Sequence, residues 1–184
     1  MRTFNFDILE TIKKRWSARA LSEKEVKRED VYALIEAASF APSAMNEQPW
    51  RFIIGHENET LIKLRESLSS SNQEWANRAP VLICLLSKKT HERNGRENKY
   101  HIFDSGTAFG FLSLEATQRG LIAHGMGGFD KDKVREMFKI ENEYDIVLMI
   151  AVGYYGDKSL LSESNQVREN PGNRKSYKDI IIQE

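Results

Sequence analysis

The segment at 41–52 combines two prolines with several polar side chains. Pro42 and Pro49 each disfavour helix at the preceding residue and lack a backbone donor, so the loop between them should be rigid and irregular. Hydrogen-bonding side chains on this loop come from Ser43, Asn46 and Gln48. Such a loop between a helix and a strand suits a ligand site, although a simple proline-bounded turn explains the same residues equally well.

A second stretch places two arginines around a serine near the N-terminus. Arg15, Ser17 and Arg19 follow a short helical pattern, and a basic pair, Arg174 and Lys175, lies near the other end of the chain. Arginine is a bidentate donor for phosphate, so these residues could converge on one anionic ligand. Taken alone, Arg15 is better explained as part of a solvated basic helix end.

Together, four segments resemble the FMN-dependent nitroreductase family. They are Arg-x-Ser-x-Arg at 15–19, Pro-Ser-x-x-Asn-x-Gln-Pro-Trp-x-Phe at 42–52, Gly-Met-Gly-Gly-Phe-Asp at 125–130 and Arg-Lys-Ser at 174–176. Their order and spacing are similar to the family's and cover nearly the whole chain. The resemblance implies an α+β fold with a mixed sheet of four to five strands flanked by helices. It also implies an intertwined homodimer with an FMN at each subunit interface.

The resemblance implies a phosphate end and a ring end for the cofactor site. The phosphate would be bound by Arg15, Arg174 and Lys175, with Ser17 nearby. Arg19 would reach the N1 and O2 edge of the flavin, where a cation that cannot lose its charge stabilises the reduced, anionic ring. Trp16 departs from the small residue or histidine that is commoner there in the family, and it either packs under the flavin or fills the core.

Further flavin contacts are implied on three other segments. The residues expected from the partner subunit are Pro42, Ser43, Ala44, Asn46 and Gln48. Asn72 would bond the N3 and O4 side of the ring. Met126, Gly127 and Gly128 would form a turn whose backbone N–H groups approach flavin N5, since glycine permits close contact. A glycine turn before a capped helix is the same structure without the ligand.

The resemblance also implies a reaction. NAD(P)H would deliver hydride to FMN and leave, and a nitroaromatic, quinone or similar flat acceptor would take its place. No catalytic side chain is required, because the cofactor carries the chemistry. A specialised member of the fold, dehalogenase-like or flavin-fragmenting, is one alternative, and a non-catalytic FMN-binding protein is another.

The composition argues against several other classes of protein. The 184 residues are enough for one domain, 1–184, with a real core, and 27 basic residues balance 27 acidic ones. A balanced charge argues against a nucleic-acid binder, and the four histidines lack metal-ligand spacing. No apolar run approaches membrane-spanning length and no signal-peptide core is present, so we expect a cytoplasmic protein. Cys84, within an apolar run, is expected to be a buried, inert thiol.

Hydrophobic periodicity places these residues on helices and strands. We expect a first helix from Asn5 or Asp7 to Lys14, and others over 28–40, 59–68 and 100–119, with one more capped by Asp130. Strands are expected over 51–54, 81–86, 121–123 and 146–152.

Other stretches give less regular signals. Residues 69–72 predict a solvated linker, 88–99 a mobile surface segment that could be a lid, and 180–182 a β-prone end that needs a sheet edge. The helix over 100–119 is apolar all round, which indicates burial on more than one side. Gly106 and Gly110 share one face of it and allow close approach of another helix, either in a dimer or within the chain.

Overall fold

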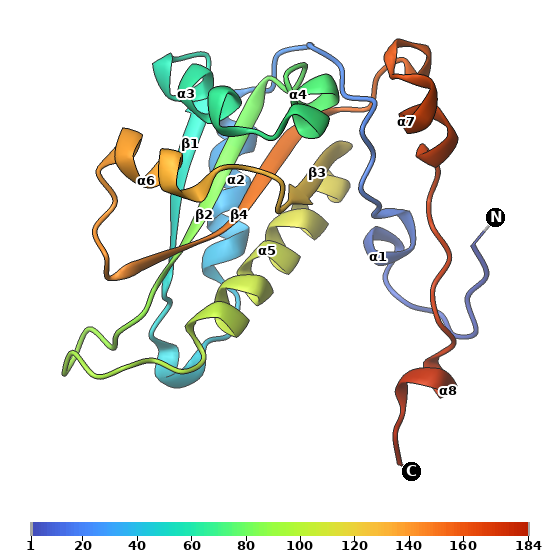
Figure 1. Cartoon of the computed structure of the whole chain (residues 1–184). Coiled ribbons are helices and arrows are strands. Elements are labelled where there is room, and N and C mark those ends of the chain that lie inside the picture. Colours follow the sequence, from blue (N-terminus) through green and yellow to red (C-terminus); the bar gives the residue numbers. More distant parts are fainter. Residues whose placement is uncertain (1, 184) are drawn as a thin grey trace.

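Four antiparallel strands form the centre of the molecule, in the order β1-β2-β4-β3. The computed structural model, shown in Figure 1, describes residues 2–183. The strands are β1 (Trp50–His56), β2 (Val81–Lys88), β3 (Leu121–Met126) and β4 (Tyr144–Tyr154). Strand β2 is buried along its first seven residues because strands flank it on both edges and helices cover both faces, which accounts for its continuous apolar run.

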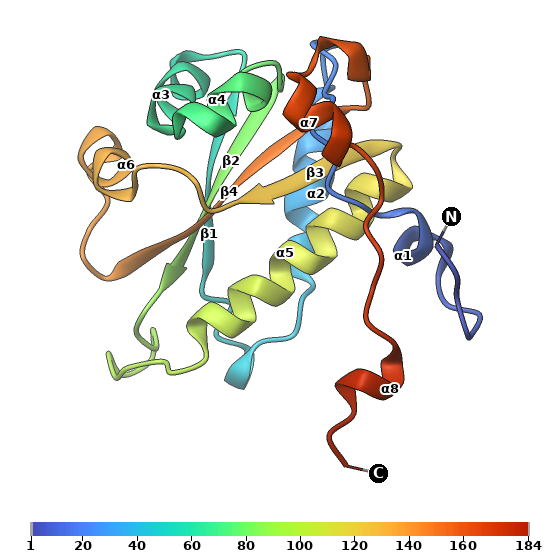
Figure 2. The same cartoon turned by 45° about the vertical axis from the view of Figure 1, so that its right-hand side comes forward.

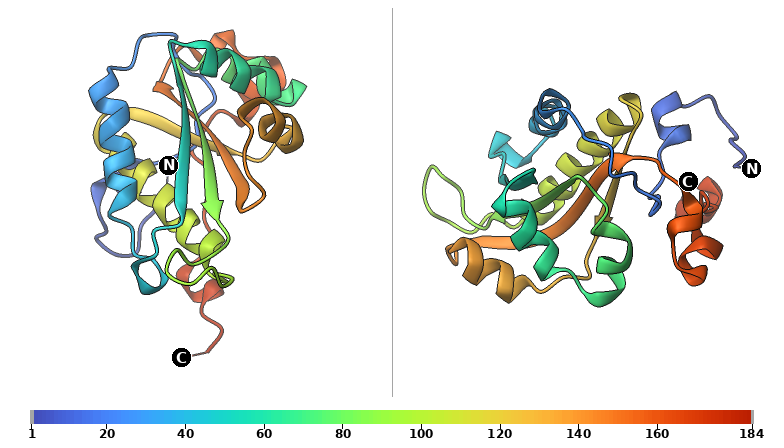
Figure 3. Two further views of the ribbon diagram at one scale, coloured as in Figure 1. Left: turned by 90° about the vertical axis from the view of Figure 1, so that its left-hand side faces the viewer. Right: turned by 90° about the horizontal axis from the view of Figure 1, so that it is seen from above.

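Helices pack on both faces of this sheet (Figure 3). One face carries α3 (Glu59–Ser67), α4 (Ser70–Ala76) and α6 (Lys131–Phe138). The other carries α2 (Arg28–Ser39) and α5 (His101–Gln118). Each face has its own cluster of buried apolar residues, so the sheet separates two hydrophobic layers.

Local sequence explains where the helices of the first face begin and how closely they pack. The side chain of Asn58 accepts a hydrogen bond from Leu61 N at 3.1 Å and caps α3, and Asp130 caps α6 in the same way. A Cβ at Gly55 would lie 2.6 Å from the Cα of Leu61. Glycine at this position therefore lets the first turn of α3 lie directly on β1.

Both ends of the chain lie to one side of the sheet (Figures 1 and 2). They include the short helices α1 (Glu10–Lys14), α7 (Glu163–Arg168) and α8 (Tyr177–Ile180). Two single turns of 3-10 helix, η1 (Ala44–Asn46) and η2 (Lys158–Leu160), complete the elements. Neither core cluster includes a residue before 18 or after 161, so the two ends are arms on the outside of the core.

The expected α+β class, the four strands and the flanking helices are confirmed. Every pairing among the described residues is antiparallel, so these residues alone form neither the mixed sheet nor a fifth strand. The strands are longer than expected, because polar and glycine residues at their ends still pair with neighbours.

Three local expectations differ from the structure. Residues 70–76 form helix α4 and not a linker, because burial of Trp75 and Ala76 outweighs the local preference of Ser and Asn for turns. The apolar tail contains the helical turn α8, closed by a capping box between Ser176 and Asp179, and pairs with no strand of residues 2–183, so its docking on a neighbour's sheet edge stays a prediction. Helix α1 starts only at Glu10, since the Asp7 carboxylate pairs with Lys13 at 2.7 Å and caps nothing.

Helix α5 is buried on one side only within this chain, against the expectation of burial on several sides. Its inner face includes Ala108, Leu112 and Ala116, which pack with α2 and the sheet. The outer face leaves Phe103 74 % exposed and Phe111 40 % exposed. A large apolar surface on this helix is therefore left uncovered by residues 2–183.

Candidate functional site

The 15–19 segment is an extended stretch of chain that buried side chains hold from two sides. The Ala18 carbonyl accepts a hydrogen bond from Nδ1 of His124 in β3 at 2.9 Å. The carboxylate of Glu169, just after α7, accepts from the backbone N–H groups of Arg19 and Ala20, each at 2.9 Å. Both Glu169 and His124 are buried. The backbone is thus fixed, and the arginine side chains on it start from defined positions.

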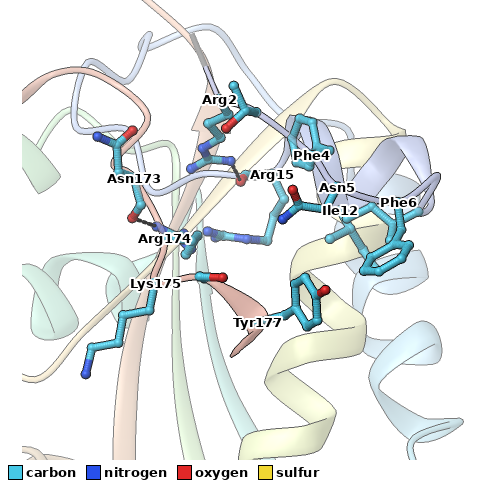
Figure 4. Close-up of a pocket in the computed structure, with 13 residues that line it drawn as sticks. Arg2, Phe4, Asn5, Phe6, Ile12, Arg15, Asn173, Arg174, Lys175 and Tyr177 are labelled. Carbon is cyan, nitrogen blue, oxygen red and sulfur yellow. Dashed lines mark hydrogen bonds between the residues drawn. The ribbon is translucent and has the colours of Figure 1, made fainter. Parts of the chain in front are cut away.

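Three arginines converge on one cavity between the two arms (Figure 4). Arg2, Arg15 and Arg174 line this cavity, which has a volume of about 650 Å³. Burial, together with the charges of Arg174 and Arg2, lowers the pKa of Arg15. Within residues 2–183 none of the three forms an ion pair with a carboxylate. A cluster of like charges without a counter-charge is suited to an anion such as a phosphate.

Ser17 and Lys175 join this cluster to different extents. The Ser17 hydroxyl oxygen accepts a hydrogen bond from Nη1 of Arg15 at 3.4 Å. Lys175 lines the same cavity, but Figure 4 shows its side chain extending away from the guanidinium groups of Arg15 and Arg174. Of the four residues expected at the phosphate, the structure therefore brings Arg15, Ser17 and Arg174 together, with Lys175 at the margin.

Arg19, Asn72 and Gly128 meet at a second point, around the indole ring of Trp75. The guanidinium carbon of Arg19 lies 6.0 Å from the centroid of this ring. Asn72 Nδ2 donates to the carbonyl of Gly128 at 2.8 Å. A Cβ at Gly128 would lie 2.6 Å from that nitrogen, so any larger residue would displace the Asn72 amide from this contact. Residues from three separate motifs are thus adjacent at what would be the ring end of the site.

His124 lies behind this group and is neutral at pH 7. Burial lowers its pKa to about 4, the nearby Arg19 and Arg15 lower it in smaller measure, and the bond to Ala18 opposes them. Since a carbonyl only accepts hydrogen bonds, the ring hydrogen sits on Nδ1. The charges of Arg15 and Arg19 thus both act on His124.

The two glycine-turn residues before Gly128 differ in burial. Met126 ends β3 and is buried, whereas Gly127 is exposed and has no atom within 4 Å of the position of a Cβ. Trp16 is half-buried, and its ring packs on Tyr155 with the centroids 5.7 Å apart. Trp16 belongs to neither core cluster, and its aromatic neighbour Tyr155 lies just after β4.

The two-proline loop does not reach either group within one chain. Figures 1 and 2 show this turn at the foot of the molecule, beside the start of α5, while α4 lies at the opposite end. Its hydrogen bonds run to neighbouring segments instead, as with Ala44 N, which donates to Asp104 Oδ2 in α5 at 3.0 Å. The residues that the structure keeps apart from the rest are Pro42, Ser43, Ala44, Asn46 and Gln48. Their contribution to a partner's site stays a prediction.

The loop is held in an unusual conformation. Met45, Asn46 and Gln48 all have positive φ, between 48° and 59°, which is costly for residues other than glycine. Gln48 N donates to Ser43 Oγ at 3.0 Å, and Glu92 N donates to Glu47 Oε2 at 3.0 Å. The 88–99 segment is thereby braced against the loop by a hydrogen bond, and its role as a lid stays a prediction.

Other expectations concern chemistry outside this group. Cys84 is fully buried as expected, and burial raises its pKa to about 12, which favours an inert thiol. Within residues 2–183, no three His, Cys, Asp or Glu side chains cluster in a way that could hold a metal ion. Over the same residues, no helix is long and apolar enough to cross a membrane.

Comparison with known proteins decides the family. The model of the Nitroreductase family matches residues 12–154. The chain belongs to this family. A solved structure described as an oxidoreductase containing FMN shares its fold with a TM-score of 0.94 at 32 % identity, covering 99 % of this chain and 94 % of that one.

Two curated relatives of this nitroreductase-family chain differ in name. One, from Archaeoglobus fulgidus, has the provisional name NADH dehydrogenase/NAD(P)H nitroreductase and is 27 % identical over 172 residues, covering 90 % of this chain and 94 % of that protein. The other, an iodotyrosine deiodinase from Thermotoga neapolitana, is 25 % identical over 178 residues, covering 84 % and 92 %. The relatives therefore include more than one activity on the same fold.

Sequence reasoning missed several residues that hold this nitroreductase-family site together. Arg2 donates to the Arg15 carbonyl at 2.8 Å and to the Gly172 carbonyl at 3.2 Å, so it fastens one arm to the other. Glu169 and His124 fix the 15–19 segment from positions far along the chain. Trp75 alone left a local signal, because it lies three residues after Asn72 and shares a helix face with it.

Proposed function

We propose that this protein is an FMN-dependent oxidoreductase. Hydride from NAD(P)H would pass through FMN to a nitroaromatic, a quinone or a similar flat acceptor, in ping-pong order. The observation that carries the proposal is the cavity in which Arg2, Arg15 and Arg174 meet without a carboxylate partner among residues 2–183. The FMN-containing structure that is 32 % identical supports the same ligand. NAD(P)H is the reductant suggested by the names of relatives, and the cytoplasm is where we expect the reaction.

The donors suit each part of FMN. The arginine cluster offers fork-shaped donors for a phosphate dianion. Arg19 makes no side-chain hydrogen bond and no ion pair within residues 2–183, which leaves its guanidinium available to the N1 and O2 edge of a flavin. Asn72 and the turn at Met126, Gly127 and Gly128 complete the ring end. FMN would supply the hydride chemistry, and these residues would bind it, orient it and stabilise charge on its reduced ring.

We further propose that the chain acts as a single FMN-binding domain in a homodimer with composite sites. The uncovered face of α5 supports this, since Phe103 and Phe111 are exposed on it. A Cβ at Gly106 or Gly110 would meet no atom within 4 Å. The close approach that these glycines allow is therefore not used within residues 2–183 and is left for another chain. A second subunit would also bring the two-proline loop to the cofactor.

Purification and anaerobic reduction test the proposal. Protein expressed with excess riboflavin should be yellow, and acid precipitation should release FMN and not FAD. Addition of NADH or NADPH without oxygen should bleach the bound flavin, and a nitroaromatic or a quinone should restore its absorbance. Protein that takes up no FMN would refute the proposal, whereas FMN that nicotinamides cannot bleach would indicate a binding protein without turnover.

A dehalogenase-like activity is the second candidate, because the deiodinase relative covers most of this chain. The 88–99 segment, which is braced against the two-proline loop, is the part that would select such a substrate. Reduced enzyme should be offered iodotyrosine and a nitroaromatic in parallel. Release of iodide at a rate above that of nitro reduction would favour the second candidate.

A further inference from the structure

Trp75 contacts two of the residues that would face the flavin ring, although nothing in the proposed chemistry requires a tryptophan. Its ring lies 6.0 Å from the guanidinium carbon of Arg19. Its indole Nε1 donates to Oδ1 of Asn72 at 3.3 Å. The side chain is only 2 % exposed and belongs to the core cluster on the α3 and α4 face. Trp75 thus joins the hydrophobic core to the ring end of the site.

We propose that Trp75 is a positioning residue for the flavin, which orients the amide of Asn72 and holds the cation of Arg19 at the ring end. This inference rests on the proposed function, because both residues act on FMN. It predicts two separable effects, one on hydrogen bonding to the oxidised ring and one on the charge of the reduced ring.

The orientation of the Asn72 amide follows from the chemistry of its two neighbours. An indole N–H is only a donor, so the amide oxygen must face Trp75. The Gly128 carbonyl is only an acceptor, so the amide nitrogen must face Gly128. The amide keeps one free hydrogen and one free lone pair in fixed directions. A flavin offers the matching pair along one edge, a donor at N3 and an acceptor at O4.

The position of Arg19 is fixed by contacts that form a closed path. Glu169 holds its backbone N–H, and His124 holds the carbonyl of Ala18, the residue before it. The ring of His124 in turn packs on Trp75, with the centroids 4.5 Å apart and the planes at 36°. The face of Trp75 then restricts the positions of the Arg19 guanidinium by cation–π attraction. The guanidinium can therefore bind a ligand, but the conformation of the side chain is restricted.

Variants that remove one contact at a time test this inference. Trp75→Phe keeps an aromatic face for Arg19 but removes the donor to Asn72. Trp75→Leu removes both. Leu64→Ala is the matched control, because Leu64 is fully buried in the same core cluster and its aliphatic side chain offers neither a hydrogen bond to Asn72 nor an aromatic face to Arg19. For each protein, the dissociation constants of oxidised and reduced FMN are obtained from fluorescence titration and from the midpoint potentials of bound and free flavin.

The expected pattern distinguishes positioning from packing. Trp75→Phe should weaken the binding of oxidised and of reduced FMN by a similar factor of about 2 to 10, which is the effect of losing one neutral hydrogen bond. Trp75→Leu should weaken the binding of reduced FMN about tenfold more than the binding of oxidised FMN, since the Arg19 cation is no longer held at the ring. Leu64→Ala should lower thermal stability and leave the ratio of the two constants unchanged.

Two outcomes would overturn the inference. The first is a Trp75→Leu protein with the wild-type ratio of constants, and the second is a Leu64→Ala protein that changes the ratio as much. Either result would make Trp75 a core residue only, while FMN binding by the wild type would still support the proposed function. A wild type that binds no FMN would refute the proposed function, and this inference with it.

Discussion

The guanidinium of Arg19 forms no ion pair within residues 2–183, whereas its backbone N–H is fixed by hydrogen bonds. The carboxylate of Glu169 bonds the main chain of this residue and leaves the guanidinium to other partners. Burial is the main cause that lowers the pKa of Arg19, with Arg168 adding to it. An arginine stays protonated in spite of such a shift, so the site offers a permanent positive charge.

Replacing Arg19 by alanine should therefore change flavin redox chemistry more than flavin affinity. Loss of a charge-assisted hydrogen bond to the reduced ring costs about 1.5–3 kcal/mol, which lowers a two-electron midpoint potential by about 30–65 mV. Spectroelectrochemical titration measures this shift. Arg19→Lys, which keeps the charge, should recover a large part of it, and an unchanged midpoint in Arg19→Ala would disprove the assigned role.

His124 should make stability depend on pH below neutrality. Burial lowers its pKa from 6.5 to about 4. Between pH 6.5 and 4, His124 is therefore protonated in the unfolded chain but neutral in the folded chain. The free energy of unfolding consequently falls as pH drops from 6.5 towards 4. The contribution is on the order of 2–3 kcal/mol. Denaturant unfolding of wild type and His124→Gln at several pH values checks this, since other acidic groups cancel in the difference. A difference that is constant between pH 7 and 4 would contradict it.

At the scale of elements, the contact between the β3–α6 turn and α4 is the tightest in the candidate site. Gly128 O accepts from Asn72 Nδ2 and also from Ser69 N at 3.0 Å. A Cβ at this glycine would meet Asn72 Nδ2 at 2.6 Å and Ser69 Oγ at 2.8 Å. A Cβ at neighbouring Gly127 would meet no atom within 4 Å. Replacing each glycine by alanine therefore distinguishes the effect of close packing, present only at Gly128, from the effect of reduced backbone freedom, present at both.

Gly128→Ala should destabilise the protein without FMN, whereas Gly127→Ala should not. Overpacking typically costs about 1–3 kcal/mol, which for a chain of this length lowers Tm by roughly 2–10 °C. Neither glycine has the positive φ that would strain an alanine by itself. Thermal unfolding of both variants in the absence of flavin makes the comparison. Equal Tm values for the two would show that α4 yields easily and that the close contact has little energetic weight.

Elements with a strong periodic pattern were predicted well, and elements that depend on distant partners were not. The apolar run at 81–86 identified β2 because both faces of that strand are buried. Helix α4 was missed because its sequence is polar and its stability comes from Trp75, which packs against β3. The same limit applies to Arg2 and Glu169, whose roles rest on contacts across about 150 residues or more of sequence. The family motifs identified the candidate site residues, but not the side chains that support them.

At the scale of the whole molecule, the chain exposes more surface than a compact monomer. Its accessible area is 11120 Å² at a mass of 21.2 kDa. A folded monomer of that mass is expected to expose about 9,100 Å². Apolar groups left uncovered on the arms and on the outer face of α5 contribute to it, such as Phe6, Phe103 and Ile182. In the proposed homodimer, a second copy of the chain would cover part of this surface and complete the proposed cofactor site.

The C-terminal arm should link FMN binding to assembly. Arg174 lines the cationic cavity, and Arg2 holds Gly172 just before it. Further along, Tyr177 packs edge-on against Phe6 at 5.2 Å. Neither core cluster contains a residue of this arm. The core should therefore fold without it, although the cavity would lose one of its three guanidinium groups.

Deleting the residues after Asn173 should accordingly weaken FMN binding and lower Tm together, while far-UV circular dichroism still reports a folded core. A ligand that binds only the assembled state stabilises that state by mass action, so added FMN should raise Tm in the full chain far more than in the shortened one. A second deletion, after Lys178, keeps Arg174 and Lys175 but removes the isoleucine tail. Comparing the two deletions distinguishes the contribution of the basic residues from that of the apolar tail. Sedimentation and thermal scans with and without FMN measure both effects. If the chain that ends at Asn173 stays dimeric and binds FMN as tightly as the full chain, the arm has no part in the site.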